Sequence, residues 1–395
     1  MNQASNNNNP EKPSFFNSPQ FRSIAAQALL LAALSVFFYF IIQNMLANME
    51  ARGITTGFAF LHEKAGFGIL QTLIPYSEDS TYGRTFIVGL LNTLLVSGLG
   101  IVFASILGFI IGVARLSKNW LVSRIAGVYI ETFRNIPLLL QIFFWYFAVI
   151  RPLPSPRQSL SIGDWIFLNV RGLYLPRPEL ESGFGWMLAA LAIAIVAVLL
   201  LRRWAIRRHY ETGKTFPLLL TSIVILVGLP LLAYLASGGT IAWDKPVLKG
   251  FNFQGGITVI PELLALLIAL TIYTAAFIAE TVRAGILSVS HGQTEAALAL
   301  GLTQTQTLNM VIIPQALRVI IPPLTSQYLN LVKNSSLATA IGYPDLVSVF
   351  MGTTLNQTGQ AVEIISMTMG VYLTISLLIS AFMNWYNHKM ALVER

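Results

Sequence analysis

The sequence predicts an all-α polytopic membrane protein with about eight transmembrane helices. Three observations lead to this fold class. Hydrophobic residues make up 55% of the chain and charged residues only 11%, which differs strongly from soluble domains. The mean hydropathy is +0.66. Several apolar runs reach about 20 residues, which is long enough for a helix to cross a hydrocarbon core of about 30 Å.

Eight apolar segments are predicted to span the membrane. They cover residues 24–46, 86–116, 125–150, 184–201, 216–236, 259–277, 311–332 and 364–385. The first is longer than the apolar core of a secretory signal and follows a polar stretch that includes Lys12 and Arg22. We therefore expect it to be retained as a membrane span rather than cleaved.

The basic residues orient the chain in the membrane. Arg202, Arg203, Arg207 and Arg208 follow the fourth span in a short loop, and positively charged short loops stay in the cytoplasm. Counting spans from there places both termini and the loop around Glu295 on the cytoplasmic side. The loop 151–182 is assigned outside by the same count, although it is rich in arginine. The net charge of +8 then reflects a basic inner face, and no nucleic-acid partner is needed.

Five regions are expected along the chain. Residues 1–22 are rich in Asn, Ser and Pro and are predicted to be a disordered cytoplasmic tail. Residues 23–84 hold an extra N-terminal helix and an external loop. A five-span core is split into residues 85–150 and 255–395, the second part containing a loop near 290–310. Residues 151–254 form an insertion with two further spans.

Small residues recur on one face of the second span. Gly100, Ala104, Gly108 and Gly112 are spaced by four and let helices approach closely in lipid, where packing drives association. The pattern favours packing inside one chain. A specific dimer face is the alternative.

A polar island between two long apolar segments has the features of two short helices. Glu295, Ala296 and Ala297 begin a helix-like run, and Gly301 is suited to the left-handed conformation that stops a helix. Thr303 with Gln306 three positions later reads as a capping box that starts the next helix. A membrane loop with such defined ends predicts a surface that docks another protein.

The segment from Glu131 to Gln141 places charge and a helix break at membrane depth. Glu131 and Arg134 are three residues apart and can pair on one helix face, and Pro137 disfavours helix before it. Broken helices within a membrane are tolerated where they line protein or a water-filled path. The candidates for a polar translocation route are therefore Glu131, Arg134, Asn135 and Gln141. A buried ion pair that only positions helices is the alternative.

Two further polar groups are candidates for the same route. Asn330, Lys333 and Asn334 interrupt apolar sequence, and Lys333 offers a positive charge to a carboxylate. Its alternative role is a lysine that extends from a span end to the membrane interface. Asn92 and Thr93 either meet substrate or hydrogen-bond neighbouring helices.

Several chemistries are excluded. The chain has no cysteine, and its histidines His62, His209, His291 and His388 are scattered, so no metal site or catalytic residue is expected. Gly213-Lys214-Thr215 lacks the earlier glycine of a phosphate-binding loop. The chain is therefore not expected to be an enzyme or to bind a cofactor such as ATP.

The two polar segments resemble those of ATP-binding-cassette (ABC) import permeases. Glu295-Ala296-Ala297 with Gly301 and the distant Val311-Ile312-Ile313-Pro314 is similar to the coupling motif of that family. The stretch from Phe133 to Gln141 is similar to a segment of its amino-acid branch, and so are the residues from Glu280 to Leu287 and from Leu331 to Leu337.

This resemblance implies a type I importer permease for polar or general L-amino acids in the bacterial inner membrane. It also implies a cytoplasmic ABC ATPase dimer, a second permease subunit, either a related sister chain or a second copy, and a periplasmic amino-acid-binding protein. Glu295, Ala296, Ala297, Gly301 and Pro314 would then couple the permease to the ATPase.

Two other functions remain open from the residues alone. An ion-coupled secondary transporter would use Glu131, Arg134 and Lys333 as coupling charges, although no inverted repeat is visible. A membrane anchor would recruit a cytoplasmic protein through the loop around Glu295 without a polar path, and the helix break at Pro137 argues against it.

Overall fold

The structure is a computed structural model that describes residues 19–51, 53, 56–180, 184–213, 216–238 and 241–390. Two of the sequence predictions fall partly beyond these ranges. Residues 1–18 of the predicted tail lie outside the described residues, and so do Lys214 and Thr215 of the incomplete phosphate-binding triplet.

Helices dominate the described part of the chain. The long ones are α1 (Pro19–Ala51), α2 (Tyr82–Arg115), α3 (Trp120–Asn135), α5 (Phe184–Thr212), α6 (Leu218–Ala236), α7 (Pro261–Leu287), α10 (Ile313–Asn334) and α12 (Ala361–Met390). The short ones are η2 (Ala59–His62), α4 (Leu138–Phe143), η3 (Phe144–Ile150), η4 (Pro156–Gln158), α8 (His291–Ala299), α9 (Gln304–Thr307), η5 (Leu308–Ile312), η6 (Ser335–Ile341), η7 (Val347–Thr354) and α11 (Leu355–Thr358). Within the described ranges, seven helices are long and apolar enough to cross a membrane, or eight if a bent pair counts as one span.

The bent pair is the predicted span 125–150. The chain turns by 106° between α3 and the helical segment of α4 and η3, so residues 125–150 do not form one straight helix. Ile136 is extended, and Pro137 precedes the first residue of α4, as the restriction of residues before proline requires. The break predicted at Pro137 is confirmed. By contrast, α10 continues through Pro322 and Pro323.

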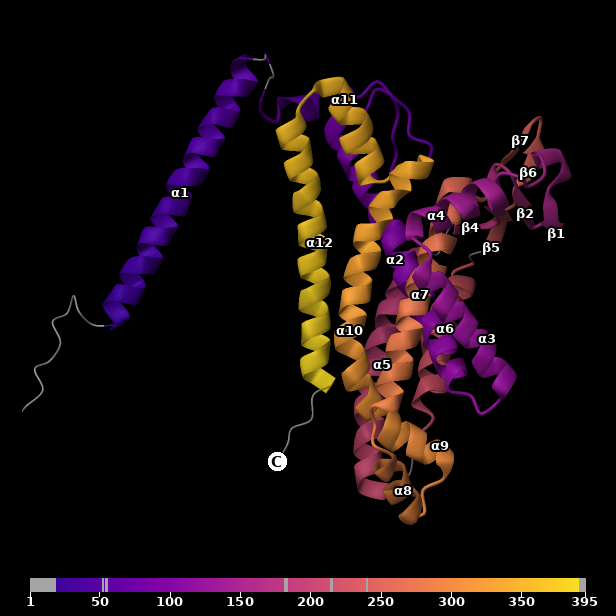
Figure 1. Cartoon of the computed structure of the whole chain (residues 1–395). Helices are drawn as coiled ribbons and strands as arrows, with labels where there is room; N and C mark the ends of the chain where they lie inside the picture. Colours follow the sequence, from indigo (N-terminus) through magenta and orange to yellow (C-terminus); the bar gives the residue numbers. More distant parts are fainter. Residues whose placement is uncertain are drawn as a thin grey trace, which may run out of the picture.

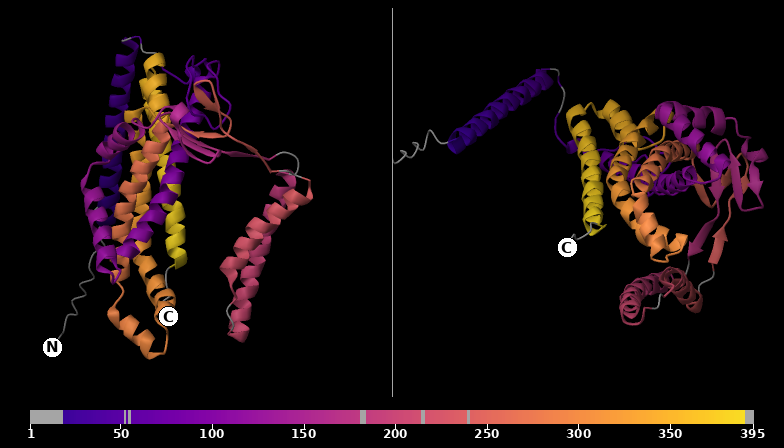
Figure 2. Two further views of the ribbon diagram at one scale, coloured as in Figure 1. Left: turned by 90° about the vertical axis from the view of Figure 1, so that its right-hand side faces the viewer. Right: turned by 60° about the horizontal axis from the view of Figure 1, so that its bottom comes forward.

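The centre of the bundle is built from α2, α7 and α10, which Figures 1 and 2 show side by side. The small-residue stripe of α2 faces these neighbours. A Cβ atom added to Gly108 would lie 2.7 Å from Cβ of Ile278, and one added to Gly112 would lie 2.7 Å from the carbonyl oxygen of Ala279. The preferred interpretation of the stripe, packing inside one chain, is confirmed.

We expect Gly108→Leu to destabilise the bundle by about 1–3 kcal/mol or more, because a larger side chain must displace α7 backbone. Gly98→Leu is the matched control, since a Cβ at this position of the same helix meets nothing within 4 Å. Thermal unfolding of the purified protein would compare the two. Equal melting temperatures would contradict close packing of α2 on α7.

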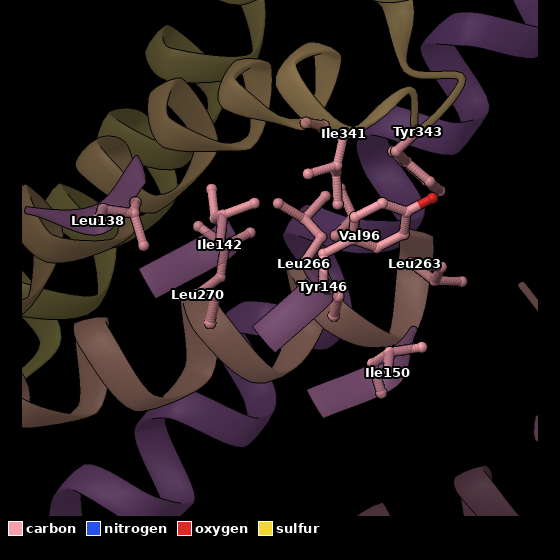
Figure 3. Close-up of a cluster of buried hydrophobic side chains, with 13 residues drawn as sticks. Val96, Leu138, Ile142, Tyr146, Ile150, Leu263, Leu266, Leu270, Ile341 and Tyr343 are labelled. Atoms are coloured by element: carbon pink, nitrogen blue, oxygen red, sulfur yellow. The ribbon is translucent and has the colours of Figure 1, made fainter. Parts of the chain in front are cut away.

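A buried cluster fastens the bent segment to α7 (Figure 3). Its members come from α4 and η3, from α7, and from the segments around Val96 and Ile341: Leu138, Ile142, Tyr146, Ile150, Leu263, Leu266, Leu270, Val96, Ile341 and Tyr343. Burial of this apolar surface inside the bundle holds the segment after the break against α7. The hydroxyl of Tyr146 also donates to Oε1 of Glu262 at 2.8 Å.

Residues 151–180 of the predicted external loop form strands, and together with residues 241–259 they are called here the β module. Its strands are β1 (Leu160–Ile162), β2 (Ile166–Asn169), β3 (Gly172–Leu175), β4 (Arg177–Leu180), β5 (Ile241–Asp244), β6 (Val247–Lys249), β7 (Asn252–Gln254) and β8 (Ile257–Val259). They form an antiparallel sheet in the order β1-β2-β3-β8 and the pairs β4-β5 and β6-β7.

The sequence interpretation missed this module because its strands are short and its pairings are distant. Leu173 pairs with Val259 and Arg177 with Asp244, across both membrane helices α5 and α6. Those helices pack on each other beneath the module (Figure 2), while α1 stands apart from the bundle (Figure 1).

Candidate functional site

The polar island at residues 288–312 is a helical loop, as predicted. The backbone N–H of Gly301 donates to the carbonyl of Leu298 at 2.9 Å, and that of Leu302 donates to the carbonyl of Ala297 at 3.2 Å. With φ of 80° at Gly301, these two bonds form a Schellman motif at the end of α8. The capping box of Thr303 and Gln306 then starts α9, with both reciprocal hydrogen bonds present.

The surface of the helical loop combines polar and apolar groups. Glu295 is exposed and lies 3.1 Å from Nδ1 of His291, whereas Ala297 is buried and Ala296 is exposed. Leu300 is 84% exposed and Met310 67% exposed, and Leu298 is exposed beside them. These apolar residues were not predicted from the sequence, although leucines within a polar loop indicate that the loop exposes apolar side chains. The loop thus exposes three large apolar side chains, Leu298, Leu300 and Met310, in addition to its polar groups.

The helical loop is tied to the bundle at both ends. Nε2 of Gln315 in α10 donates to Oε1 of Gln293 in α8 at 3.3 Å, and Pro314 is half-buried in the first turn of α10. At the end of α7, a Cβ on Gly285 would collide with Ile320 of α10. The helical loop is therefore in direct contact with α10, and α7 and α10 pack closely where it begins and ends.

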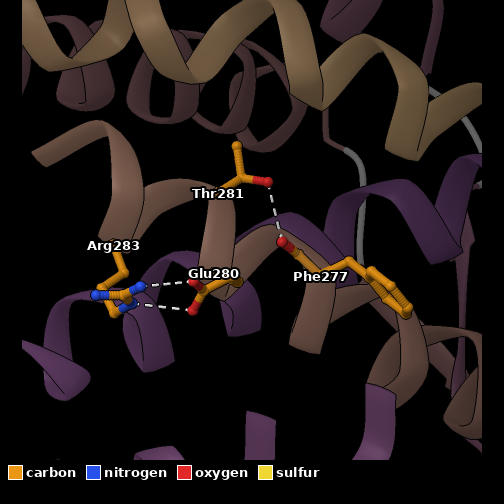
Figure 4. Close-up of polar contacts among 4 residues, drawn as sticks. All are labelled: Phe277, Glu280, Thr281 and Arg283. Carbon is orange, nitrogen blue, oxygen red and sulfur yellow. Dashed lines mark hydrogen bonds and ion pairs between the residues drawn. The ribbon is translucent and has the colours of Figure 1, made fainter. Parts of the chain in front are cut away.

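Close to this end of α7, Glu280 and Arg283 form a bidentate ion pair (Figure 4). Nη2 and Nε of Arg283 donate to the two carboxylate oxygens at 2.6 and 2.9 Å. Both side chains are about one-third exposed, at 30% and 33%, so the pair lies at a boundary with solvent rather than in the core. Their spacing of three residues on one helix face allows this pairing.

A polar pocket of about 240 Å³ lies between α7 and α10. It is lined by Tyr273, Thr274, Phe277, Gln327, Asn330 and Asn334. Asn330 and Asn334 were predicted from the sequence. The other four were missed, because only the packing of α7 against α10 places aromatic rings opposite the amides.

Arg134 lies beside this pocket without its expected partner. Its guanidinium is 5.3 Å from the centre of the Phe277 ring, a pocket residue, in cation–π geometry. Among the described residues no ion pair joins Arg134 to Glu131, so the predicted pairing is wrong. Both side chains are exposed, and Nδ2 of Asn135 donates instead to the Glu131 carbonyl at 2.6 Å.

The Gln141 side chain hydrogen-bonds backbone carbonyls at the helix break, which leaves its amide nitrogen unavailable to substrate. It is only 4% exposed, and its Nε2 donates to the carbonyls of Phe133 at 3.0 Å and Ile136 at 2.9 Å. These carbonyls have no backbone N–H partner in a helix, because α3 ends at Asn135, just before Pro137. The structure therefore favours a structural role for this candidate.

Asn92 and Thr93 are also buried inside the bundle, both at 0% exposure. Nδ2 of Asn92 donates to the carbonyls of Gln71 and Pro344 at 2.9 and 2.8 Å, and Thr93 Oγ1 accepts from the Leu346 backbone at 3.0 Å. They fasten the segment before η7 to α2, which favours the helix-bonding alternative. Lys333 does not line the polar pocket. Its side chain lines an apolar groove with Met351, Met369 and Tyr372.

We expect Gln141→Leu to destabilise the protein by about 1–3 kcal/mol for each carbonyl left without a donor. Gln254→Leu, at an exposed position of the β module, is the control and should change stability little. Thermal unfolding of both purified variants measures the difference. If Gln141→Leu melts like the unaltered protein, its amide does not stabilise the break.

Within the described ranges, no three His, Asp or Glu side chains converge into a group that could hold a metal ion.

Membrane-crossing helices, a polar pocket among them and a capped helical loop at one end together define a polytopic membrane transport component. A family model described as "Binding-protein-dependent transport system inner membrane component" matches residues 191–392. The chain belongs to this family. It is a multi-pass inner membrane protein and a transport permease, not an enzyme.

Relatives match over nearly the whole chain. The putative amino-acid ABC transporter permease protein YhdX of Escherichia coli K12 is 58% identical, over 96% of this chain and 97% of its own. The general L-amino acid transport system permease protein AapQ of Rhizobium johnstonii is 52% identical over 95% and 94%. The glutamate/glutamine/aspartate/asparagine transport system permease protein BztB of Rhodobacter capsulatus is 46% identical over 95% of both chains.

Among solved structures, a chain of the crystal structure of an amino acid ABC transporter with histidines aligns at a TM-score of 0.46. It is 20% identical and covers 78% of this chain and 95% of its own.

Proposed function

We propose that this chain is a permease subunit of an ABC importer for L-amino acids, of polar or broad range. It works with a cytoplasmic ATPase dimer, with a second permease subunit that is a related sister chain or a second copy, and with an extracytoplasmic amino-acid-binding protein. In this proposal residues 85–150 and 255–395 form the five-helix permease core, and residues 151–254 are an insertion. Relatives named as amino-acid permeases at 46–58% identity support the substrate class.

The observation that carries the proposal is the position of the helical loop relative to the pocket. α7 contributes Tyr273, Thr274 and Phe277 to the pocket and then runs, through Glu280 and Arg283, directly into the helical loop. One rigid helix therefore joins the polar pocket to the docking surface.

The helical loop receives the movement of the ATPase. Its exposed leucines enter an apolar cleft of the ATPase, Glu295 supplies a polar contact at the rim, and Ala296 allows close approach. ATP binding favours one state of the ATPase, and the rigid contact passes that preference to α7 and α10. Differential affinity of ATP and of the loaded binding protein for the two permease states drives the cycle.

The polar pocket is the proposed substrate route. Arg134 supplies the positive charge that meets a substrate carboxylate, and the amides of Gln327, Asn330 and Asn334 offer donors and acceptors to polar groups. A volume of about 240 Å³ suits one amino acid better than a peptide. Two aromatic rings, 5.0 Å apart at Tyr273 and Phe277, form the apolar wall.

Orientation follows from this assignment. With the helical loop in the cytoplasm, the first described turn of α1 and the last of α12 lie at the cytoplasmic end as well (Figure 1). The β module lies at the opposite, extracytoplasmic end. The ion-coupled alternative gains no support, because the relatives that match nearly the whole chain are named as permease proteins of amino-acid transport systems, and none of these names mentions a coupling ion.

The proposal is tested by amino-acid uptake into proteoliposomes that hold this chain with its ATPase, partner permease and binding protein. Uptake that requires internal ATP is the expected result. ATP-independent uptake that follows an imposed proton or sodium gradient would overturn the proposal.

A further inference from the structure

The β module contains a second polar pocket, of about 600 Å³, that the transport route does not use. Arg157, Ser159, Ser161 and Asp164 line one side, and Lys245 and Phe253 line the other. The two sides come from separate segments of the chain, which side-chain contacts bring together: the ring centres of Phe167 and Phe253 lie 4.5 Å apart. Volumes of roughly 300–1,000 Å³ are typical of binding pockets.

The charged groups of this pocket are held in place yet unpaired. The guanidinium of Arg157 lies 4.9 Å from the centre of the Phe251 ring, and Nζ of Lys245 lies 3.9 Å from that of Trp165. Within the described part of the chain, neither cation nor Asp164 takes part in an ion pair. Aromatic rings thus fix the cations while leaving their charge available to a partner.

The module as a whole is basic. Its six cations are Arg151, Arg157, Arg171, Arg177, Lys245 and Lys249, and its three carboxylates are Asp164, Glu179 and Asp244. Asp244 is already engaged, because it pairs with Arg177 at 3.1 Å and accepts from the Gly256 backbone at 2.9 Å. The remaining surface therefore complements an acidic partner.

Exposed apolar and aromatic residues surround the pocket. Ile162, at the end of β1, is 72% exposed, and Phe251, in the turn between β6 and β7, is 75% exposed. Trp165 and Trp243 are also exposed and contact each other edge to face, with ring centres 5.8 Å apart. Compared with the rest of a protein's surface, protein–protein interfaces are enriched in aromatic residues and arginine. An anionic lipid surface selects a cluster of cations, whereas this pocket is concave and contains a carboxylate.

The module is joined rigidly to α7. β8 ends at Val259, two residues before the first turn of α7, and a Cβ on Gly172 of β3 would collide with the Val259 carbonyl. At the same point Tyr146 bonds Glu262 of α7, and the guanidinium of Arg151 lies 5.4 Å from the centre of the Tyr146 ring. A load on the module is therefore passed to the helix that ends at the helical loop.

We propose that the β module is a docking surface for an acidic face of the extracytoplasmic binding protein, with the Arg157–Lys245 pocket at its centre. This inference rests on the proposed function and names the surface that receives this partner. Family membership already implies a binding protein, because the family description names a binding-protein-dependent system. Docking on the module signals through α7 to the helical loop at the other end of the molecule.

The test uses the complete transporter in nanodiscs and its purified binding protein. Arg157→Glu combined with Lys245→Glu should weaken the affinity for the loaded binding protein at least about tenfold and flatten its dependence on salt. Basal ATP hydrolysis should stay unchanged. Lys64→Glu is the control for reversal of a single charge: Lys64 is 74% exposed, pairs with Asp79 at 3.0 Å and lies in the loop between α1 and α2, outside the β module.

A second measurement does not depend on altering the charges. A photo-crosslinking amino acid at position 251 should capture the binding protein, and one at position 64 should not. Unchanged affinity in the double variant, or an equal loss in Lys64→Glu, would overturn the inference. So would an effect of the double variant that appears only with anionic lipid, which would assign the surface to headgroups. ATP-driven uptake by the unaltered transporter is measured separately. Its absence would overturn the proposed function, whereas the affinity and crosslinking results decide the docking inference.

Discussion

Gly301→Leu is expected to abolish coupled uptake while leaving the permease folded. A non-glycine residue at φ of 80° costs about 1–2 kcal/mol, which a bundle of this size tolerates. A Cβ at Gly301 meets nothing within 4 Å of this chain, so the leucine projects outward to where the ATPase docks. We expect ATP-driven uptake to fall by more than about tenfold, and ATP hydrolysis to stop responding to the loaded binding protein. Uptake and hydrolysis are measured on the same proteoliposomes.

Two variants separate the causes. Gly301→Asn keeps the left-handed conformation accessible and should retain most of the coupling. Gly292→Leu adds the same side chain on α8, where φ is not positive and the nearest atom to a Cβ is Oγ of Ser290 at 3.6 Å. Normal coupled uptake in Gly301→Leu would contradict a coupling role for this turn. Equal losses in Gly292→Leu and Gly301→Leu would assign the effect to added bulk rather than to the turn.

Asn330→Leu is expected to raise the KM for uptake by about ten- to a hundredfold, because each substrate group left without a partner costs about 1–3 kcal/mol. The leucine keeps a similar volume and the helical conformation of α10. Stimulation of ATP hydrolysis by the loaded binding protein should persist, because the helical loop is intact. Measuring uptake across substrate concentrations, together with hydrolysis, distinguishes this result from the uncoupling expected at Gly301.

Lys333→Leu is the matched comparison on the same helix. Its side chain lines the apolar groove with Met351 and Tyr372 and not the pocket of Asn330. If the pocket between α7 and α10 carries the substrate, Lys333→Leu should leave KM nearly unchanged. The reverse pattern, a large effect at Lys333 and none at Asn330, would move the route to the other face of α10.

The local features of both sites were predictable because neighbouring residues produce them. Gly301 stops α8, Thr303 and Gln306 cap α9, and Pro137 ends α3, each through bonds within a few residues. The Glu280–Arg283 pair likewise follows from their spacing on one helix face. Glu131 and Arg134 have the same spacing but do not pair, because spacing permits a contact without deciding which neighbour competes for it.

For several candidate residues, contacts with residues distant in the sequence determine the role that sequence spacing left ambiguous. The ring of Phe277 lies far from Arg134 along the chain, yet it takes the guanidinium that Glu131 was expected to hold. Gln141 resembled a substrate ligand in the sequence, and only the 106° bend shows that it bonds the carbonyls left free by that bend. Asn92 and Thr93 were ambiguous until the segment from Tyr343 to Leu346 was found packed against them.

The sequence by itself determined the membrane class, the places of the spans and the capped helical loop. These depend on apolar length and on hydrogen bonds between residues close along the chain. Only the tertiary structure decided that Tyr273, Phe277 and Asn330 share a pocket, and that β3 pairs with β8 to build the β module. Such contacts join residues tens of positions apart, and the free energy that selects them comes from packing and strand pairing, which no local pattern encodes.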